Sequence, residues 1–378
     1  MTEIPEVRRR EHTSTLGATT PLGVADATTL PVSRPSKAKI VGRVLFLLLS
    51  AFALYGLLPQ LLDVFEEIPK LRDLNPVWFI ATLLLEMGSF VCQWSLTRTA
   101  LPQVSWFVAG TSQLVSNAVS KTVPGGAAMG AATGYRMLSV SGVNRGTAGA
   151  ALAGTAIVSN GVLFALPMVA VIGSILSAPV PSDLALIAWG GALLFLMLFA
   201  VVFTLVRFDR PLWAVGRIVE RVTRWVYGKI HRPGGPTAAG LVHQRDAMVD
   251  ALGSRWEMAL AAAVGNWGLD YLALVAALYA VGAKPRLSLV LLAYGAAAVL
   301  SMIPITPGGL GFVEAGLTAT LIAAGVNGPD ALLATLAYRV VSYWLPLPAG
   351  LGASFLFRRR YGRVDLEASE EPSPSGGG

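Results

Sequence analysis

Apolar tracts long enough to cross a lipid bilayer recur along this chain of 378 residues, and they constrain its fold more than any other feature. A membrane-spanning helix needs about 20 consecutive, mostly apolar residues. The tracts of that length predict an all-α, polytopic helical membrane bundle with about 6 full spans, over residues 41–62, 77–97, 146–176, 184–206, 256–281 and 331–357.

The composition agrees with a membrane location. Hydrophobic residues make up 54% of the chain and charged residues only 13%, against roughly 25% in soluble domains. So few charges cannot coat a soluble protein of this size. Cys92 is the only cysteine, and the three histidines lie outside the apolar tracts. We therefore expect no intrachain disulfide, no catalytic residues, no metal site and no cofactor.

Basic residues are concentrated on one side of the predicted bundle, although Lys284 and Arg286 are exceptions. Because basic segments stay in the cytoplasm, we expect residues 1–39 and 359–378 to be disordered cytoplasmic tails that flank a membrane domain at 40–358. The composition, rich in Ala, Gly, Val and Arg, favours a bacterial plasma membrane. The net charge of +7 suits contact with anionic lipid headgroups. No segment is long enough for a folded nucleic-acid-binding domain.

Residues 207–255 form the only large polar insertion, a basic cytoplasmic loop in which we predict an amphipathic helix. Apolar residues repeat at helical spacing between Val215 and Val226, opposite a stripe formed by Arg217, Arg221 and Arg224. This pattern is typical of a helix that lies in the headgroup layer. A gating or partner-docking element is the alternative.

Two further apolar tracts, at residues 104–141 and 287–324, are each interrupted by Pro-Gly-Gly. The tracts match each other without a gap, and Pro307 follows Pro124 by 183 residues. The distribution of basic residues places the ends of the first tract on the basic side and those of the second on the other. The sequence therefore predicts two helical hairpins, re-entrant or paired crossings, in an inverted-topology repeat like that of many secondary transporters.

The two breaks are expected to mark a substrate site near the membrane midplane. Proline removes a backbone donor and glycine loosens the helix, so backbone groups lose their helical partners there. Such groups are tolerated in a membrane only when they are buried in protein or line a wet cavity. A helix that begins after each break would point its N–H groups at an anion. A pair of structural kinks is the alternative.

Ionisable residues near the breaks are candidate functional groups because charges inside membrane spans are costly. Lys121 lies three residues before Pro124 and could meet a phosphate, as could Arg136, which could equally be a loop charge near the surface. We expect Glu314, seven residues after Pro307 and two helical turns into the helix that follows the second break, to pair with Arg339 in the last span.

Glu86 and Asp270 are candidates for ion coupling. They lie at roughly equivalent places in the two spans that precede the broken tracts. Carboxyl groups at such positions could carry protons or bind a cation.

The run Pro-Ile-Thr-Pro-Gly-Gly-Leu-Gly-Phe-Val-Glu over residues 304–314, followed by Tyr338-Arg339, resembles the flippase-like membrane domain of the lysylphosphatidylglycerol synthase/flippase family. The resemblance covers roughly residues 40–358 and implies a bundle that handles lipids. It does not extend to the soluble aminoacyltransferase domain of bifunctional members, so we expect no lipid synthesis. The family's motif residues correspond to Pro124, Gly125, Gly126, Arg136, Pro307, Gly308, Gly309, Gly311, Glu314 and Arg339.

The main hypothesis is a transporter, not an enzyme, that moves an anionic or aminoacylated phospholipid, with Lys121 and the motif residues binding it. The sequence contains no Gly-x-x-x-x-Gly-Lys-Ser/Thr nucleotide-binding loop. A membrane-embedded transferase, an accessory subunit of a lipid- or envelope-modifying enzyme, and an ion-coupled carrier of a small anion are the alternatives. Membrane lipids are the expected partners, and homo-oligomerisation or a lipid-modifying enzyme partner stays open.

Overall fold

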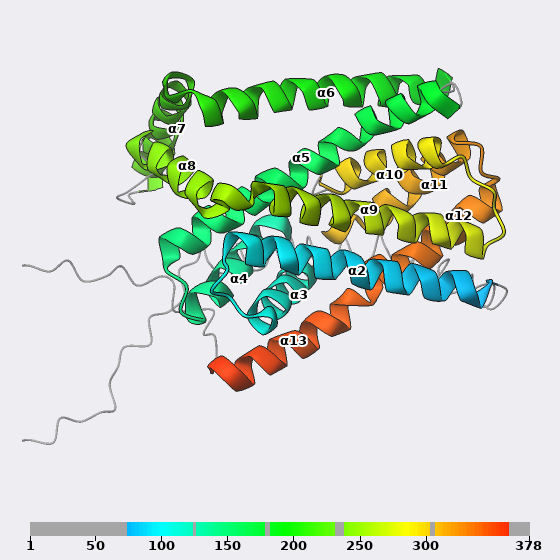
Figure 1. Ribbon diagram of the computed structural model, residues 1–378, viewed down its shortest axis with the longest axis horizontal. Coiled ribbons are helices and arrows are strands. Elements are labelled where there is room, and N and C mark those ends of the chain that lie inside the picture. Colours follow the sequence, from blue (N-terminus) through cyan, green and yellow to red (C-terminus); the bar gives the residue numbers. More distant parts are fainter. Residues whose placement is uncertain (1–73, 124–125, 178–181, 231–237, 303–306, 363–378) are drawn as a thin grey trace, which may run out of the picture. The chain divides into compact units, whose positions relative to one another are not determined.

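A computed structural model describes residues 74–123, 126–177, 182–230, 238–302 and 307–362, and these residues fold into helices joined by short turns (Figure 1). The described residues all belong to one compact unit, Leu48–Gly378. The predicted span at 41–62, the tail at 1–39, and Pro124 and Gly125 lie outside the described residues. The last helix continues to Tyr361, past residue 359, where the tail was predicted to begin.

Within the described residues, five helices are long and apolar enough to cross a membrane. They confirm five of the predicted spans and the all-α, polytopic fold. They are α2 (Pro76–Ala100), α5 (Arg145–Ser177), α6 (Ser182–Arg207), α9 (Trp256–Ala280) and the continuous stretch Gly328–Tyr361, which contains α12 (Gly328–Arg339) and α13 (Pro346–Tyr361).

The outer surface of these helices is apolar. In α6, Leu186 is 83% exposed, and Trp189 and Phe199 are also exposed. A soluble protein rarely exposes so much contiguous apolar surface, whereas hydrocarbon tails solvate it well. The exposed residues therefore mark the face of the bundle that contacts lipid.

Both broken tracts fold as helical hairpins. The first consists of α3 (Trp106–Thr122) and α4 (Gly126–Val140), and the second of α10 (Leu287–Ser301) and α11 (Phe312–Ala323). At 1.5 Å per residue, helices of this length measure roughly 18–25 Å and cannot cross a hydrocarbon core of about 30 Å. We conclude that each hairpin is re-entrant and returns to the side where it starts.

The two hairpins approach each other from opposite ends of an antiparallel helix pair, α2 and α9 (Figure 1). The Asn75 amide donates to the Ala280 carbonyl at 2.9 Å, which ties the start of α2 to the end of α9. The hairpin tips meet in the interior, where a Cβ atom on Gly308 would lie 2.8 Å from the Lys121 carbonyl oxygen. This arrangement is the one that an inverted repeat predicts.

Glycines hold the first hairpin together. A Cβ atom on Gly126 would collide with the Ser120 carbonyl oxygen, and one on Gly130 would lie 2.6 Å from the Ser116 carbonyl oxygen. A Cβ atom on Gly134 would likewise lie 2.6 Å from the Ser116 hydroxyl oxygen. Small residues at every fourth position let two membrane helices approach backbone to backbone, which is how α4 packs on α3.

The basic ends of the spanning helices gather at one end of the bundle, the left-hand end in Figure 1. The connecting helices α7 (Asp209–Ile230) and α8 (Ala238–Leu252) lie there too, followed by a single 3-10 turn (Gly253–Arg255). Arg245 of α8 contacts Asp209 at 2.7 Å. Val215 and Ile218 of the apolar stripe of α7 are exposed, as expected for a helix that rests on lipid.

A π-helical turn, Val340–Trp344, separates α12 from α13 in the last span. Before this turn, α12 packs on α9 and on α11 of the second hairpin. Beyond it, α13 packs on α3 of the first hairpin. Such turns often occur at functional sites, and this one brings Ser342 and Tyr343 to the place where the hairpin tips meet.

Candidate functional site

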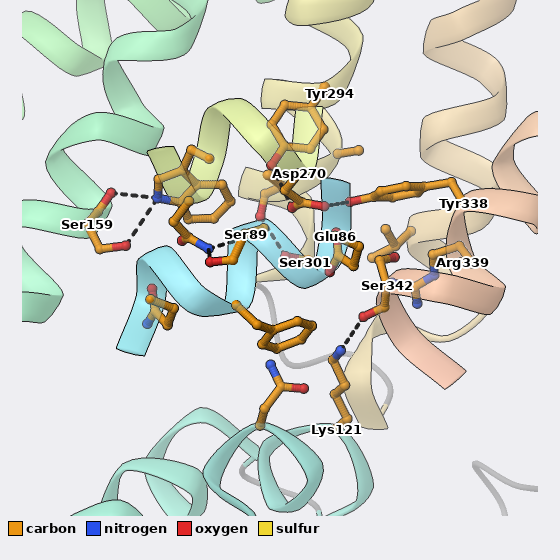
Figure 2. Close-up of a pocket in the computed structure, with 18 of the residues that line it drawn as sticks. Glu86, Ser89, Lys121, Ser159, Asp270, Tyr294, Ser301, Tyr338, Arg339 and Ser342 are labelled. Carbon is orange, nitrogen blue, oxygen red and sulfur yellow. Dashed lines mark hydrogen bonds between the residues drawn. The ribbon is translucent and has the colours of Figure 1, made fainter. Parts of the chain in front are cut away.

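A polar cavity of about 330 Å³ lies between the two hairpins and the α2–α9 pair (Figure 2). Helices α2, α3, α5, α9, α10, α11 and α12 and the π-helical turn all contribute to its wall. Polar groups are expensive inside a membrane bundle, so this concentration indicates a functional site. The polar lining residues are Glu86, Ser89, Gln93, Gln113, Asn117, Lys121, Ser159, Asn266, Trp267, Asp270, Tyr294, Ser301, Tyr338, Arg339 and Ser342.

Lys121 lies in the last turn of α3, on the wall opposite Asp270 (Figure 2). Its Nζ atom donates to the Ser342 carbonyl oxygen at 2.7 Å and lies 5.1 Å from the centre of the Tyr343 ring. Within the described part of the chain, Lys121 forms no ion pair. An ammonium has three N–H donors, so two remain for a ligand in the cavity.

Arg339 forms the ion pair with Glu314 that the sequence predicted. Arg339 Nε lies 2.6 Å from Glu314 Oε1, and the arginine is only 8% exposed. The guanidinium also lies 3.5 Å from the Gly308 carbonyl oxygen and 4.4 Å from the centre of the Tyr343 ring. The pair therefore joins the last span to the tip of the second hairpin.

Glu314 occupies the first turn of α11, so its predicted place two turns into the helix was wrong. The helix begins only at Phe312, because Gly308, Gly309 and Gly311 adopt φ of 64°, 72° and 77°. A carboxylate in the first turn already interacts with the helix dipole. The carboxylate of Glu314 therefore balances the positive end of the α11 dipole. An outside anion is attracted to this helix start less strongly than the sequence suggested.

Tyr343 was missed by the sequence analysis. Its ring lies beside both cations, Lys121 and Arg339, and its hydroxyl donates to the Lys121 carbonyl oxygen at 3.1 Å. A Cβ atom on Gly308 would overlap that hydroxyl, so only glycine allows this approach. An aromatic residue in an apolar span carries little sequence signal, because it more often serves simple packing.

The structure brings together the two carboxyl groups predicted for ion coupling. The hydroxyls of Tyr294 and Tyr338 each donate to Asp270, one to each oxygen, at 2.7 Å. Glu86 is 6% exposed and interacts electrostatically with Asp270. Its Oε2 atom is buried and has no partner among the described residues. Neither tyrosine was predicted as part of the site.

Amides, hydroxyls and an indole ring line the rest of the cavity. Asn266 donates to the Ser89 hydroxyl at 2.8 Å, and Trp267 Nε1 donates to the Ser159 carbonyl oxygen at 2.9 Å (Figure 2). A signal did exist for Ser159, because it aligns with Ser342 in the internal repeat and both residues line the cavity.

Several predicted binding residues lie beside the cavity and do not line it. Arg136 lies in the second half of α4, and Gly126 serves the contact between α4 and α3. Pro307, Gly309 and Gly311 shape the tip of the second hairpin. Pro124 and Gly125 are outside the described residues. In the described residues, the wall is made by side chains of the surrounding helices, not by the backbone of the Pro-Gly-Gly breaks.

The comparison with protein families agrees with this architecture. The family model for the lysylphosphatidylglycerol synthase transmembrane region matches residues 40–350. The chain belongs to that family. As a member of the lysylphosphatidylglycerol synthase transmembrane-region family, it is a multi-pass membrane protein, and the matched region contains both hairpins and the whole cavity.

Two relatives of this chain carry the name UPF0104 membrane protein. The one from Methanothermobacter thermautotrophicus is 30% identical over 97 residues, which is 26% of this chain and 28% of the relative. The one from Pyrococcus horikoshii is 32% identical over 84 residues, 22% of this chain and 25% of the relative. The chain thus matches only about a quarter of each relative's length, and neither name states an activity.

Proposed function

We propose that this protein moves an anionic or aminoacylated phospholipid across the bacterial plasma membrane, with the lipid headgroup passing through the polar cavity. The observation that carries the proposal is the ammonium of Lys121, which faces a polar cavity inside a lipid-facing bundle and has no ion-pair partner among the described residues. Every phospholipid headgroup carries a phosphate, and an unpaired ammonium in a low-dielectric site attracts it strongly.

The size of the cavity supports passage of a headgroup and not of a whole lipid. A volume of about 330 Å³ is at the small end of the range for ligand pockets. Acyl chains would remain outside in the hydrocarbon phase, where their solvation costs nothing. The protein then needs to provide a polar path only for the headgroup, which is poorly solvated in the hydrocarbon core.

We propose a transporter in preference to an enzyme. No histidine or cysteine is among the residues that line the cavity, so its wall offers neither a Ser–His nor a Cys–His pair for nucleophilic catalysis. The family model itself describes a transmembrane region. We also propose that the basic end of the bundle faces the cytoplasm, as the positive-inside rule suggests.

The proposal is tested by measuring the transbilayer movement of fluorescent phosphatidylglycerol in proteoliposomes. We expect the wild-type protein to accelerate movement and Lys121→Gln to lower the rate at least tenfold, a loss of about 1.4 kcal/mol of transition-state stabilisation. The matched control is Lys284→Gln, because Lys284 is an exposed lysine in the turn between α9 and α10. That variant should keep the wild-type rate.

Two results would overturn the proposal. One is a folded wild-type protein that moves none of the phosphatidylglycerol, phosphatidylethanolamine and aminoacylated phosphatidylglycerol probes, which would favour the accessory-subunit hypothesis. The other is an unchanged rate in Lys121→Gln, which would place the lipid path elsewhere. Uptake of free inorganic phosphate without lipid movement would instead indicate a carrier of small anions.

A further inference from the structure

We propose that Glu86 and Asp270 hold one exchangeable proton between them, and that this proton crosses the membrane together with an anionic headgroup. The inference rests on the proposed function and adds an energy source to it. Both carboxyl groups line the same polar cavity, and they interact electrostatically with each other. Two carboxylates that interact in a low-dielectric cavity resist being ionised together, so one of them retains a proton.

The hydrogen bonds indicate which carboxyl group carries the proton. Both oxygens of Asp270 accept hydrogen bonds from phenol hydroxyls, and such bonds stabilise an ionised carboxylate. Glu86 has one buried oxygen with no partner among the described residues, which would be costly for a charged group and is far less costly for a neutral one. The proton therefore belongs to Glu86.

The balance of charge around the cavity requires the same proton. The cations are Lys121 and Arg339, whereas Glu86, Asp270 and Glu314 supply three carboxyl groups. With every group ionised, the site would carry a net charge of −1 in a low-dielectric interior. One proton shared by the Glu86–Asp270 pair makes it neutral.

An anionic headgroup and this proton should bind cooperatively. A phosphate beside Lys121 adds negative charge to a cavity whose opposite wall holds the carboxyl pair, so loss of the proton becomes less favourable while the headgroup is bound. Linkage is reciprocal, and the proton therefore also favours binding of the headgroup. The two should move in the same direction, so an acidic compartment should drive anionic lipid away from its own side.

The surroundings of the pair fit a proton better than a sodium ion. Tyr294 of α10 and Tyr338 of α12 direct phenol hydrogens at Asp270, and Lys121 of α3 interacts electrostatically with both carboxyl groups. The remaining charged or titratable neighbours are Arg339 with its partner Glu314, and Tyr343 of the π-helical turn, whereas α5 contributes only Ser159 to the cavity wall. A metal cation would compete with these donors for the same oxygens.

The first test detects the proton itself and does not depend on transport. Infrared spectra of the membrane-reconstituted protein at neutral pH should show the C=O stretch of a protonated carboxyl group. The band should disappear in Glu86→Gln and persist in Glu257→Gln, because Glu257 is an exposed carboxylate at the start of α9. If the wild-type protein lacks this band, or if Glu86→Gln retains it, the inference is wrong.

The second test couples the proton to the lipid. In proteoliposomes an imposed pH gradient should accelerate movement of fluorescent phosphatidylglycerol away from the acidic side, by at most about tenfold per pH unit for one linked proton. Glu86→Gln should lose this dependence, and Glu257→Gln should keep it. Lipid movement that ignores the pH gradient, or that follows a sodium gradient, would overturn the inference and leave the proposed function intact. Absence of any lipid movement would refute both.

Discussion

The two re-entrant hairpins share a sequence pattern but are stabilised by different physical means. In the first hairpin Gly126, Gly130 and Gly134 bring the backbones of α3 and α4 into contact. The positions that align with Gly130 and Gly134 in the second hairpin are Val313 and Leu317, whose side chains are buried in the core. The second hairpin therefore packs through side chains, and its positive-φ glycines shape the tip.

The difference extends to charge. The second hairpin is joined to the last span by the ion pair of Glu314 and Arg339, whereas the aligned positions in the first half are Ala131 and Ala156. Lys121 in turn aligns with Pro304. One half thus carries a neutralised, structural pair and the other half carries a cation available to a ligand. An internal repeat can preserve the fold of its copies while dividing anchoring and binding between them.

The largest effect is expected from breaking the ion pair of the second half. Glu314→Gln or Arg339→Gln leaves the other charge buried without its partner, which should lower the free energy of unfolding by about 3–5 kcal/mol. Unfolding by SDS in mixed micelles would measure it. The double variant should lose less than the sum of the singles, because neither charge is then left alone. Singles as stable as the wild-type protein would show that the pair does not anchor the hairpin.

Exchange of side chains between the hairpins should have an intermediate effect. Gly130→Val adds to α4 the residue that α11 has at the aligned position, and it should push α4 from α3 at a cost of about 1–3 kcal/mol. Val313→Gly removes a buried side chain from the second hairpin and should cost about 1.5–3 kcal/mol. The same unfolding measurement applies.

The matched control for this exchange is Gly190→Val in α6, because a Cβ atom there would meet nothing within 4 Å. This variant should be as stable as the wild-type protein. If Gly130→Val were equally harmless, the first hairpin would not depend on backbone contact, and the proposed distinction between the two hairpins would be lost.

The smallest effect is expected at Tyr343, which lies between the halves. Tyr343→Phe keeps the ring beside both cations and removes only the hydrogen bond to the Lys121 carbonyl oxygen, for a loss of about 0.5–1.5 kcal/mol. Thermal unfolding in detergent would detect it, with Tyr361→Phe at the end of α13 as the control. A loss as large as that of Arg339→Gln would mean that the hydroxyl, and not the ring, holds the two tips together.

The sequence predicted those parts of the fold that depend on composition along the chain. Hydropathy identified the five spans that lie within the described residues, and the repeated Pro-Gly-Gly placed both hairpins. It could not show that the hairpins are re-entrant, because parity permits either form. That answer depends on where each helix begins, and the positive-φ run at Gly308, Gly309 and Gly311 shortened α11.

Prediction of the site succeeded where a residue is chemically unusual for a membrane. Glu314, Arg339, Glu86 and Asp270 were found because an ionisable side chain inside a membrane span is costly and is therefore a functional candidate. Asn117, Ser159 and Tyr338 were not found, since hydroxyls and amides occur in membrane helices for many reasons. Which of them face one cavity depends on how the helices cross, and a single sequence does not specify that.

The π-helical turn at Val340–Trp344 has a consequence for the order of residues in the last span. A π-helical turn accommodates an additional residue, and one residue corresponds to about 100° of rotation in an α-helix. The side chains of α13 are therefore rotated about the helix axis relative to those of α12. This rotation lets α12 pack on α11 of the second hairpin while α13 packs on α3 of the first. Deleting one residue from this turn would remove the rotation between the two helices. Then α13 could no longer pack on α3 while α12 packs on α9.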